Sequence, residues 1–172
     1  AWVRAEASEY IPQTVAVTPA ANRQIALTPR SGTVSLSFGG DVMFGRRFYE
    51  DDDPLEPHAQ IQTDDRESGH DSILQDVAPL FRDSDIASVN LETPLTTTGW
   101  RHPSKLYTFV SHPAAAPALE RAGIDYAALG NSHTLDALTP GLEDTRRALD
   151  AAGIDYSGAG RSSATAWRPA YF

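Results

Sequence analysis

The feature that most constrains the fold is a pentapeptide, Ala-Gly-Ile-Asp-Tyr, that occurs at 122–126 and again at 152–156, thirty residues later. Each copy follows a helix-like segment, 111–121 in the first case and 140–152 in the second. The glycine of each copy suits the left-handed position that ends a helix, and a strand pattern follows it. Thirty residues accommodate one helix and one strand, so the repeat predicts consecutive αβ units and a mainly parallel sheet covered on both faces. Two copies are fewer than the three or so that a repeat protein needs.

The segments before this repeat extend the same pattern. The alternating sequence at 33–38 and the apolar sequence at 85–92 predict two further strands. Apolar residues at helical spacing predict a helix over 72–82, which Pro79 would distort. The acidic stretch 47–69 is longer than an ordinary connection, so we expect a partly disordered loop there.

The chain is predicted to hold one α/β domain. Residues 1–31 are rich in Ala, Thr, Pro and Gln without sustained periodicity, which predicts a linker or a loosely packed arm. The domain itself is expected over 32–172. Hydrophobic residues make up 41% and charged residues 22% of the sequence, as is typical of globular domains.

The charge and the absence of cysteine limit the possible partners and metal ligands. The formal net charge is −9, and twelve of the 23 acidic residues lie between Glu50 and Asp85. Lys105 is the single lysine, so the clustered cations that neutralise phosphates are lacking and no nucleic-acid partner is expected. Without cysteine, a metal site would have to use oxygen and imidazole ligands.

Polar residues follow the predicted strands at the point where each strand ends. Asp41 follows the first strand, Asn90 and Glu92 lie at the end of the second, and Asn131 and His133 follow the third. Because parallel strands end at one edge of a sheet, these side chains are predicted to converge there. Carboxylates, an amide oxygen and an imidazole suit Mg²⁺, Mn²⁺, Fe²⁺ or Zn²⁺. Each residue could instead serve only as a turn, cap or hydrogen-bonded core residue.

Further polar residues lie near this group in the sequence. Asp136 follows His133 by three positions and could orient the imidazole, or it could simply begin a helix. Arg101 and Lys105 lie in a local cationic cluster that could receive an anionic substrate or could be a solvated surface. The remaining histidines lie in polar or proline-flanked segments and are predicted to be loop residues without metal: His58, His70, His102 and His112.

Two other classes of enzyme are not supported. The glycine-containing sequences at 39–45 and 158–163 lack the spacing of a dinucleotide-binding loop. The chain also lacks the Gly-x-Ser-x-Gly sequence that marks one large class of serine hydrolases.

Several motifs in order resemble the CapA-type poly-γ-glutamate capsule-synthesis family. They are "GDVMFGR" (40–46), "VNLETPLT" (89–96), "KLYTF" (105–109), "AGIDYAALGNSHTLDAL" (122–138) and "GLEDTRRALDAAGIDYSGAG" (141–160). That family is similar to the calcineurin-like metallophosphoesterases. The resemblance implies an αββα sandwich with a two-metal site at the strand ends, of which this chain would form the N-terminal part.

The resemblance also implies roles for individual residues. Asp41, Glu92 and Asn131 would be ligands of divalent metal ions, and His133 would lie at the catalytic centre, with Asp136 beside it. Four residues are candidates for binding substrate: Arg46, Asn90, Arg101 and Lys105. The family usually has Asn-Asn-His where this chain has Asn-Ser-His, so Ser132 is not expected to be essential.

The resemblance leaves two functions open. One is a metal-dependent hydrolase of the cell envelope, extracytoplasmic or membrane-associated, that acts on a phosphoester or a γ-glutamyl polymer. The other is a non-catalytic assembly factor that holds an anionic polymer or other capsule-synthesis proteins. Family members carry later histidine motifs that do not occur before Phe172, so we expect this chain alone to bind metal weakly and to be inactive.

Overall fold

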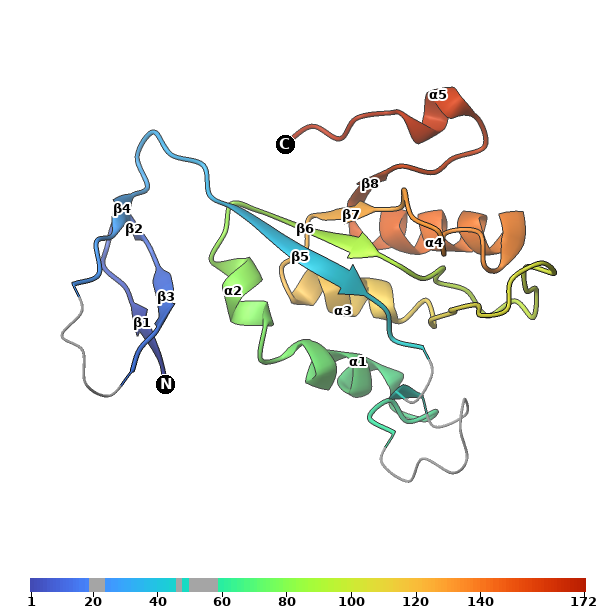
Figure 1. Ribbon diagram of the computed structural model, residues 1–172, viewed down its shortest axis with the longest axis horizontal. Coiled ribbons are helices and arrows are strands. Elements are labelled where there is room, and N and C mark those ends of the chain that lie inside the picture. Colours follow the sequence, from blue (N-terminus) through green and yellow to red (C-terminus); the bar gives the residue numbers. More distant parts are fainter. Residues whose placement is uncertain (19–23, 46–47, 50–58) are drawn as a thin grey trace.

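A parallel four-stranded sheet forms the centre of the protein (Figure 1). The computed structural model describes residues 1–18, 24–45, 48–49 and 59–172. The sheet has the order β5-β6-β7-β8, and each neighbouring pair is parallel. Its strands are β5 (Leu36–Val42), β6 (Ile86–Leu91), β7 (Tyr126–Ala128) and β8 (Asp155–Ser157).

Helices connect successive strands of this sheet, which confirms the predicted α/β class. Between β5 and β6 lie α1 (Arg66–Leu74) and α2 (Ala78–Arg82); α3 (Ala115–Arg121) precedes β7, α4 (Leu138–Ala152) precedes β8, and α5 (Ser163–Ala166) follows it. The repeated pentapeptide therefore marks the turns from α3 into β7 and from α4 into β8. The arrangement is compatible with part of an αββα sandwich.

Backbone conformation explains the two repeated glycines. Gly123 and Gly153 have φ angles of 91° and 71°, which L side chains rarely adopt. Gly153 is the C-cap of α4, as the sequence predicts. This helix begins at Leu138, before Pro140, and Leu138 itself has a φ of 58°.

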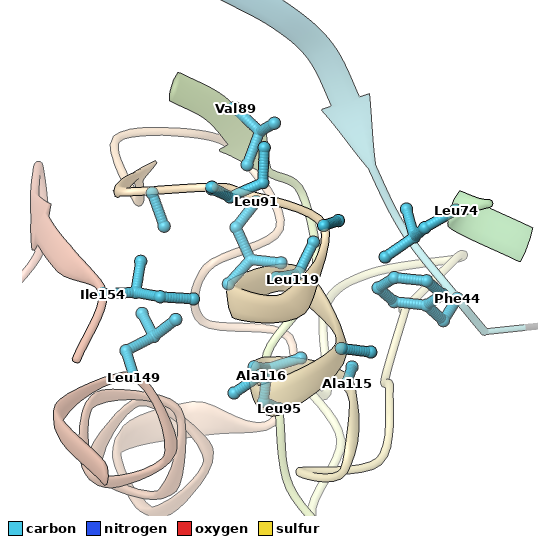
Figure 2. Close-up of a cluster of buried hydrophobic side chains, with 14 of the residues drawn as sticks. Phe44, Leu74, Val89, Leu91, Leu95, Ala115, Ala116, Leu119, Leu149 and Ile154 are labelled. Atoms are coloured by element: carbon cyan, nitrogen blue, oxygen red, sulfur yellow. The ribbon is translucent and has the colours of Figure 1, made fainter. Parts of the chain in front are cut away.

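The hydrophobic core lies on the face of the sheet that the helices cover (Figure 2). From β6 it contains Ala87, Val89 and Leu91, and α3 and α4 add Leu119 and Leu149. Alternate residues of β6 point to the opposite face, because successive side chains of a strand alternate.

On that opposite face, described side chains are partly or largely exposed. Phe38 of β5 is 78% exposed, and Phe172 near the chain end contacts Tyr126 of β7 edge-on. The coverage of both faces that the sequence predicts is therefore not found among the described residues; α1 to α4 pack on one face.

The helix predicted over 72–82 is wrong in its bounds. The structure has two helices instead, and α1 begins at Arg66, inside the stretch expected to be a partly disordered loop. Asp65 starts α1 by accepting a hydrogen bond from the Ser68 N–H, at 3.2 Å. Pro79 lies in the first turn of α2, where a missing N–H costs nothing. The proline thus begins a new helix rather than distorting one.

His70 is also not the loop histidine that the sequence predicts. It lies in α1, is fully buried, and its Nε2 contacts the Tyr49 hydroxyl at 2.8 Å. The same hydroxyl accepts a hydrogen bond from the His112 N–H, at 2.8 Å. The Tyr49 hydroxyl therefore links α1, through His70, to the segment that contains His112. His58 lies outside the described residues.

Residues 1–31 contain two small antiparallel ladders. β1 (Trp2–Ala5) pairs with β3 (Gln13–Ala16), and β2 (Tyr10–Ile11) pairs with β4 (Thr28–Pro29). Two arginines of this segment reach the domain: Arg4 donates to Asp83 at the end of α2, with the Nη2–Oδ1 distance at 2.6 Å, and Arg30 Nη1 lies 3.6 Å from Asp85 Oδ1.

Two glycines allow the ends of β7 and β8 to meet. Gly158 has a φ of 97°, and a Cβ at this position would lie 2.3 Å from the backbone nitrogen of Gly130. Close backbone packing thus accounts for this glycine of the 158–163 sequence without a phosphate-binding role.

Candidate functional site

A bulge in β5 decides which way Asp41 points. Phe38 pairs with Ser88 and Asp41 pairs with Asn90, so β5 contains one more residue than β6 between these two pairs. The extra residue reverses the alternation, and Asp41 joins Asn90 on the face opposite the core. Gly39 fits here because a Cβ would lie 3.0 Å from Phe81 and Val89. Both Gly39 and Gly40 therefore lie within β5.

Three polar side chains at the strand ends form a hydrogen-bonded row. The Asn90 amide donates to Asp41 Oδ1 at 2.7 Å, and the Asn131 amide donates to Asn90 Oδ1 at 3.0 Å. Asn131 also donates to the Leu91 carbonyl at 2.9 Å. The structure thus brings together residues from β5, β6 and the segment after β7.

Glu92 continues this group as a second carboxyl. Its side chain is hydrogen-bonded to that of Asp41, and this contact, together with burial, raises the pKa of Glu92. The Asn90 amide and the Glu92 carboxyl lower the pKa of Asp41. Of the two carboxyls, Glu92 therefore binds a proton more readily than Asp41.

His133 has its two ring nitrogens in different surroundings. Nδ1 lies 2.6 Å from Asp136 Oδ2, and Nε2 lies 3.9 Å from Glu92 Oε1. Because a carboxylate accepts hydrogen bonds, the neutral ring carries its proton on Nδ1 and presents the Nε2 lone pair toward Glu92. Phe109 stacks on the ring, with centroids 4.1 Å apart.

Asp136 is fully buried and accepts several hydrogen bonds. Besides His133 it receives the Phe109 N–H at 2.6 Å and the Lys105 ammonium at 2.5 Å. Burial raises the pKa of Asp136, but Lys105, the Phe109 N–H and His133 outweigh this and lower it. Asp136 is therefore an ionised carboxylate that fixes the orientation of the imidazole.

The predicted substrate-binding residues lie in different places. Lys105 is engaged with Asp136 and the Ser132 carbonyl, and Asn90 lies between Asp41 and Asn131. Arg101 lies apart from the carboxyl pair and lines a separate cavity. Arg46 lies outside the described residues.

The sequence reasoning missed Phe109, which contacts His133 and Asp136. Phe109 is the last residue of the quoted "KLYTF" motif, and its place in that motif is the sequence signal that points to it.

A second cavity, of about 760 Å³, adjoins Asn131 and is lined in part by Lys105, Ser132 and Gly158.

The strand-end group offers a divalent cation two carboxylates and one amide oxygen. Among the described residues, no three His, Asp or Glu side chains are arranged to hold a metal ion. The Asp41–Glu92 pair nevertheless fits a hard cation, because a divalent ion would neutralise the repulsion between two neighbouring carboxyls. The Asn131 amide oxygen already accepts from the His133 N–H at 3.0 Å and the Thr134 hydroxyl at 3.2 Å, so it would give up one of these bonds to bind metal.

Comparisons with known proteins agree with the sequence resemblance. The model of the family described as "Bacterial capsule synthesis protein PGA_cap" matches residues 35–172. The PGA biosynthesis protein CapA of Bacillus subtilis (strain 168) is 28% identical over 113 residues, which is 65% of this chain. The chain spans 26% of the length of that relative.

In the described part of the chain, no helix combines the length and the apolarity needed to cross a bilayer.

The family match covers the sheet, its helices and all of the strand-end residues named above. The predicted resemblance is thereby confirmed, and the chain belongs to the bacterial capsule synthesis protein family PGA_cap.

Proposed function

We propose that this protein acts in capsule synthesis as a metal-dependent hydrolase of the cell envelope, on a phosphoester or a γ-glutamyl polymer. One observation carries the proposal: the Asp41 and Glu92 carboxyls interact at the strand ends, which raises the pKa of Glu92, and His133 Nε2 lies 3.9 Å from Glu92 Oε1. A contact between two carboxyls is unfavourable without a proton or a cation between them. Purely structural roles do not require such a contact.

The residues divide the work as follows. Asp41 and Glu92 would hold a divalent ion, Mn²⁺, Mg²⁺, Fe²⁺ or Zn²⁺, with Asn131 as a further ligand after its amide has exchanged a hydrogen bond. The bound ion would supply an activated water and stabilise negative charge on the substrate. His133 Nε2 is placed to accept or deliver a proton, and Asp136 holds the tautomer that this requires.

Calorimetric titration with Mn²⁺ tests the metal part of the proposal. Asp41→Asn keeps the size of the side chain but removes its charge, so it should lower the Mn²⁺ affinity at least about tenfold. Asp155→Asn is the matched control, because Asp155 is an exposed residue at the opposite end of the sheet. Equal affinities of the two variants would show that Mn²⁺ binds elsewhere.

Activity should be measured on the protein as its gene encodes it, because this chain matches only part of the relative. Phosphomonoesters, phosphodiesters and γ-linked oligoglutamate are supplied with Mn²⁺, and His133→Ala is compared with wild type. A loss of about 10² to 10⁴ in kcat is expected when a positioned proton-transfer group is removed. Unchanged turnover in His133→Ala would exclude this residue from the chemistry.

The second candidate is a non-catalytic assembly factor that binds an anionic polymer or other capsule-synthesis proteins. It is favoured by the small number of ionisable ligands that converge among the described residues. Under this function, polymer binding would survive both Asp41→Ala and His133→Ala, and no substrate would be turned over.

A further inference from the structure

A polar cavity of about 480 Å³ lies beside the strand-end group. Its described lining comes from the start of α1, from the loop after β6 and from the segment that leads to α3. These lining residues are Tyr49, Arg66, Thr96, Thr97, Arg101 and the run 108–112. None of the residues proposed to hold metal is among them.

The described lining of this cavity is opposite in charge to the protein as a whole. The formal net charge is −9, with 23 acidic residues, yet the described lining holds two arginines and no Asp or Glu. A concave surface with one sign of charge attracts and concentrates ligands of the other sign. The cavity is therefore suited to an anion.

Arg101 has the geometry of an anion receptor. Its Nη1 donates to the carbonyls of Thr98 at 3.1 Å and Trp100 at 2.8 Å, which holds the guanidinium in place. Its Nε and Nη2 make no hydrogen bond to any described residue, so three N–H groups are available. A guanidinium edge of this kind matches the two oxygens of a carboxylate.

Arg66 supplies the second cation of the cavity. Its guanidinium carbon lies 5.5 Å from the centroid of the Tyr49 ring. Tyr49 is itself held by the buried contact of its hydroxyl with His70 and by the His112 N–H. The two arginines thus come from separate, anchored segments, and the cavity does not depend on a single mobile loop.

Phe109 connects this cavity to the strand-end site. Phe109 lines the cavity that contains Arg66 and Arg101. It also lines a second surface pocket, together with Lys105, Leu106, Tyr107 and His133. A ligand with several anionic groups could therefore occupy both places at once, with Phe109 between them.

We propose that the Arg66–Arg101 cavity binds carboxylate groups of a polyglutamate chain and holds a neighbouring unit of that chain at His133. The assignment of this unit to His133 rests on the proposed function; the binding of carboxylate in the cavity does not. Because the carboxylates of such a polymer repeat along one chain, one unit can bind Arg101 while another lies at His133, which a single small anion cannot do.

The test is a binding titration in the presence of a metal chelator, so that the Asp41–Glu92 pair does not contribute. Fluorescently labelled γ-linked oligoglutamate is titrated into wild type, Arg101→Gln, Arg101→Lys and Arg168→Gln at low ionic strength. Arg168 is the matched control because it is exposed and no described residue pairs with it. Oligoglutamine of the same length and inorganic phosphate are the competing ligands.

Arg101→Gln should weaken oligoglutamate binding at least about tenfold, the usual scale for losing hydrogen bonds to a charged group. Arg101→Lys should retain part of the affinity, and Arg168→Gln should stay within about twofold of wild type. Equal losses in Arg101→Gln and Arg168→Gln would overturn the proposal, since they would indicate general charge attraction. It would also be overturned if oligoglutamine bound as tightly, or if phosphate displaced the polymer at an equal concentration of anionic groups.

These outcomes are separate from those that test the proposed function. Oligoglutamate binding that depends on Arg101, without any turnover in the presence of Mn²⁺, would leave the cavity assigned and the hydrolase excluded. Turnover that depends on His133, without any effect of Arg101→Gln on binding, would support the hydrolase and overturn the assignment of the cavity.

Discussion

Phe109 lies almost flat on the imidazole of His133, with the ring centroids 4.1 Å apart and the planes inclined by 21°. The main-chain N–H of Phe109 donates to Asp136, which in turn holds His133 Nδ1. A single residue therefore restrains the imidazole both from its face and, through Asp136, from its edge. Preorganisation of this kind holds the imidazole in one orientation, as the proposed proton transfer would require.

The first prediction concerns the ion pair between buried Asp136 and partly exposed Lys105. Asp136→Asn should lower the free energy of unfolding by about 3 kcal/mol, because it leaves the ammonium of Lys105 without a counter-charge. Lys105→Met should cost less, about 1 kcal/mol, because hydrogen bonds from Phe109 and His133 still satisfy the carboxylate. Chemical denaturation of both single variants and the double variant measures the coupling.

The double variant should be more stable than the sum of the single losses predicts, by about 1 kcal/mol or more. Strict additivity would mean that the two side chains do not interact. Asp136→Asn should also move the His133 proton to Nε2, because the asparagine amide can donate to Nδ1. Nitrogen NMR of the ring reports the tautomer directly.

The second prediction is a pH dependence that comes from His70. Burial lowers the pKa of this imidazole from its ordinary value of 6.5; Arg66 and His112 lower it further, while the Arg66 carbonyl and Asp71 act in the opposite direction. Below about pH 6.5 the unfolded chain therefore binds more protons than the folded one, and the free energy of unfolding falls as the pH falls. Denaturation between about pH 7.5 and about pH 5 measures the slope.

His70→Gln removes this titration and should flatten the slope, even if the variant is less stable at every pH. His102→Gln, at a partly exposed position, is the control and should keep the wild-type slope. A slope that is the same in His70→Gln and wild type would show that other groups cause the pH dependence.

The third prediction compares two glycines that both have a positive φ angle. A Cβ at Gly158 would lie 2.3 Å from the Gly130 nitrogen, whereas a Cβ at Gly153 would meet nothing within 4 Å. Gly153→Ala should therefore cost only the backbone strain, about 1 kcal/mol. Gly158→Ala should cost at least about 2 kcal/mol more, because two backbones must separate. Similar melting temperatures for the two variants would contradict the close approach of these strand ends.

The fourth prediction concerns Leu138, which begins α4 with a φ of 58°. This conformation costs a residue with a Cβ about 1 to 2 kcal/mol, and glycine avoids the cost. Leu138→Gly should therefore have a free energy of unfolding about 1 kcal/mol higher than that of Leu138→Ala. Leu138→Ala is the control, because it removes the same packing and keeps the strain; it should give no gain. A gain in the alanine variant would assign the effect to the side chain instead.

The order of strands and helices could be predicted because its signals are local. Gly123 and Gly153 mark helix ends by themselves, and the strand patterns after them need no knowledge of distant residues. The bounds of α1 could not be predicted in the same way. Its apolar residues are few, and its anchor is the contact of His70 with Tyr49, which lies 21 residues away.

The convergence of the site followed from topology, but its detailed geometry did not. Parallel strands bring Asp41, Asn90 and Asn131 to one edge, and the structure shows their hydrogen bonds. The roles of these residues in binding metal stay predictions. The stacking of Phe109 could not be foreseen, because nothing in a sequence specifies which face of His133 an aromatic ring will cover.

The bulge in β5 makes the site sensitive to chain length as well as to chemistry. Loss of one in-frame codon at Gly39 or Gly40 would remove the bulge and leave Asp41 opposite Asn90, whereas loss of both codons would place Asp41 directly after Phe38 and on the other face of the strand. The carboxylate of Asp41 would then turn toward the helices, although every residue of the group would still be encoded. A natural homologue could thus lose this site through a deletion that a survey of amino-acid substitutions would overlook.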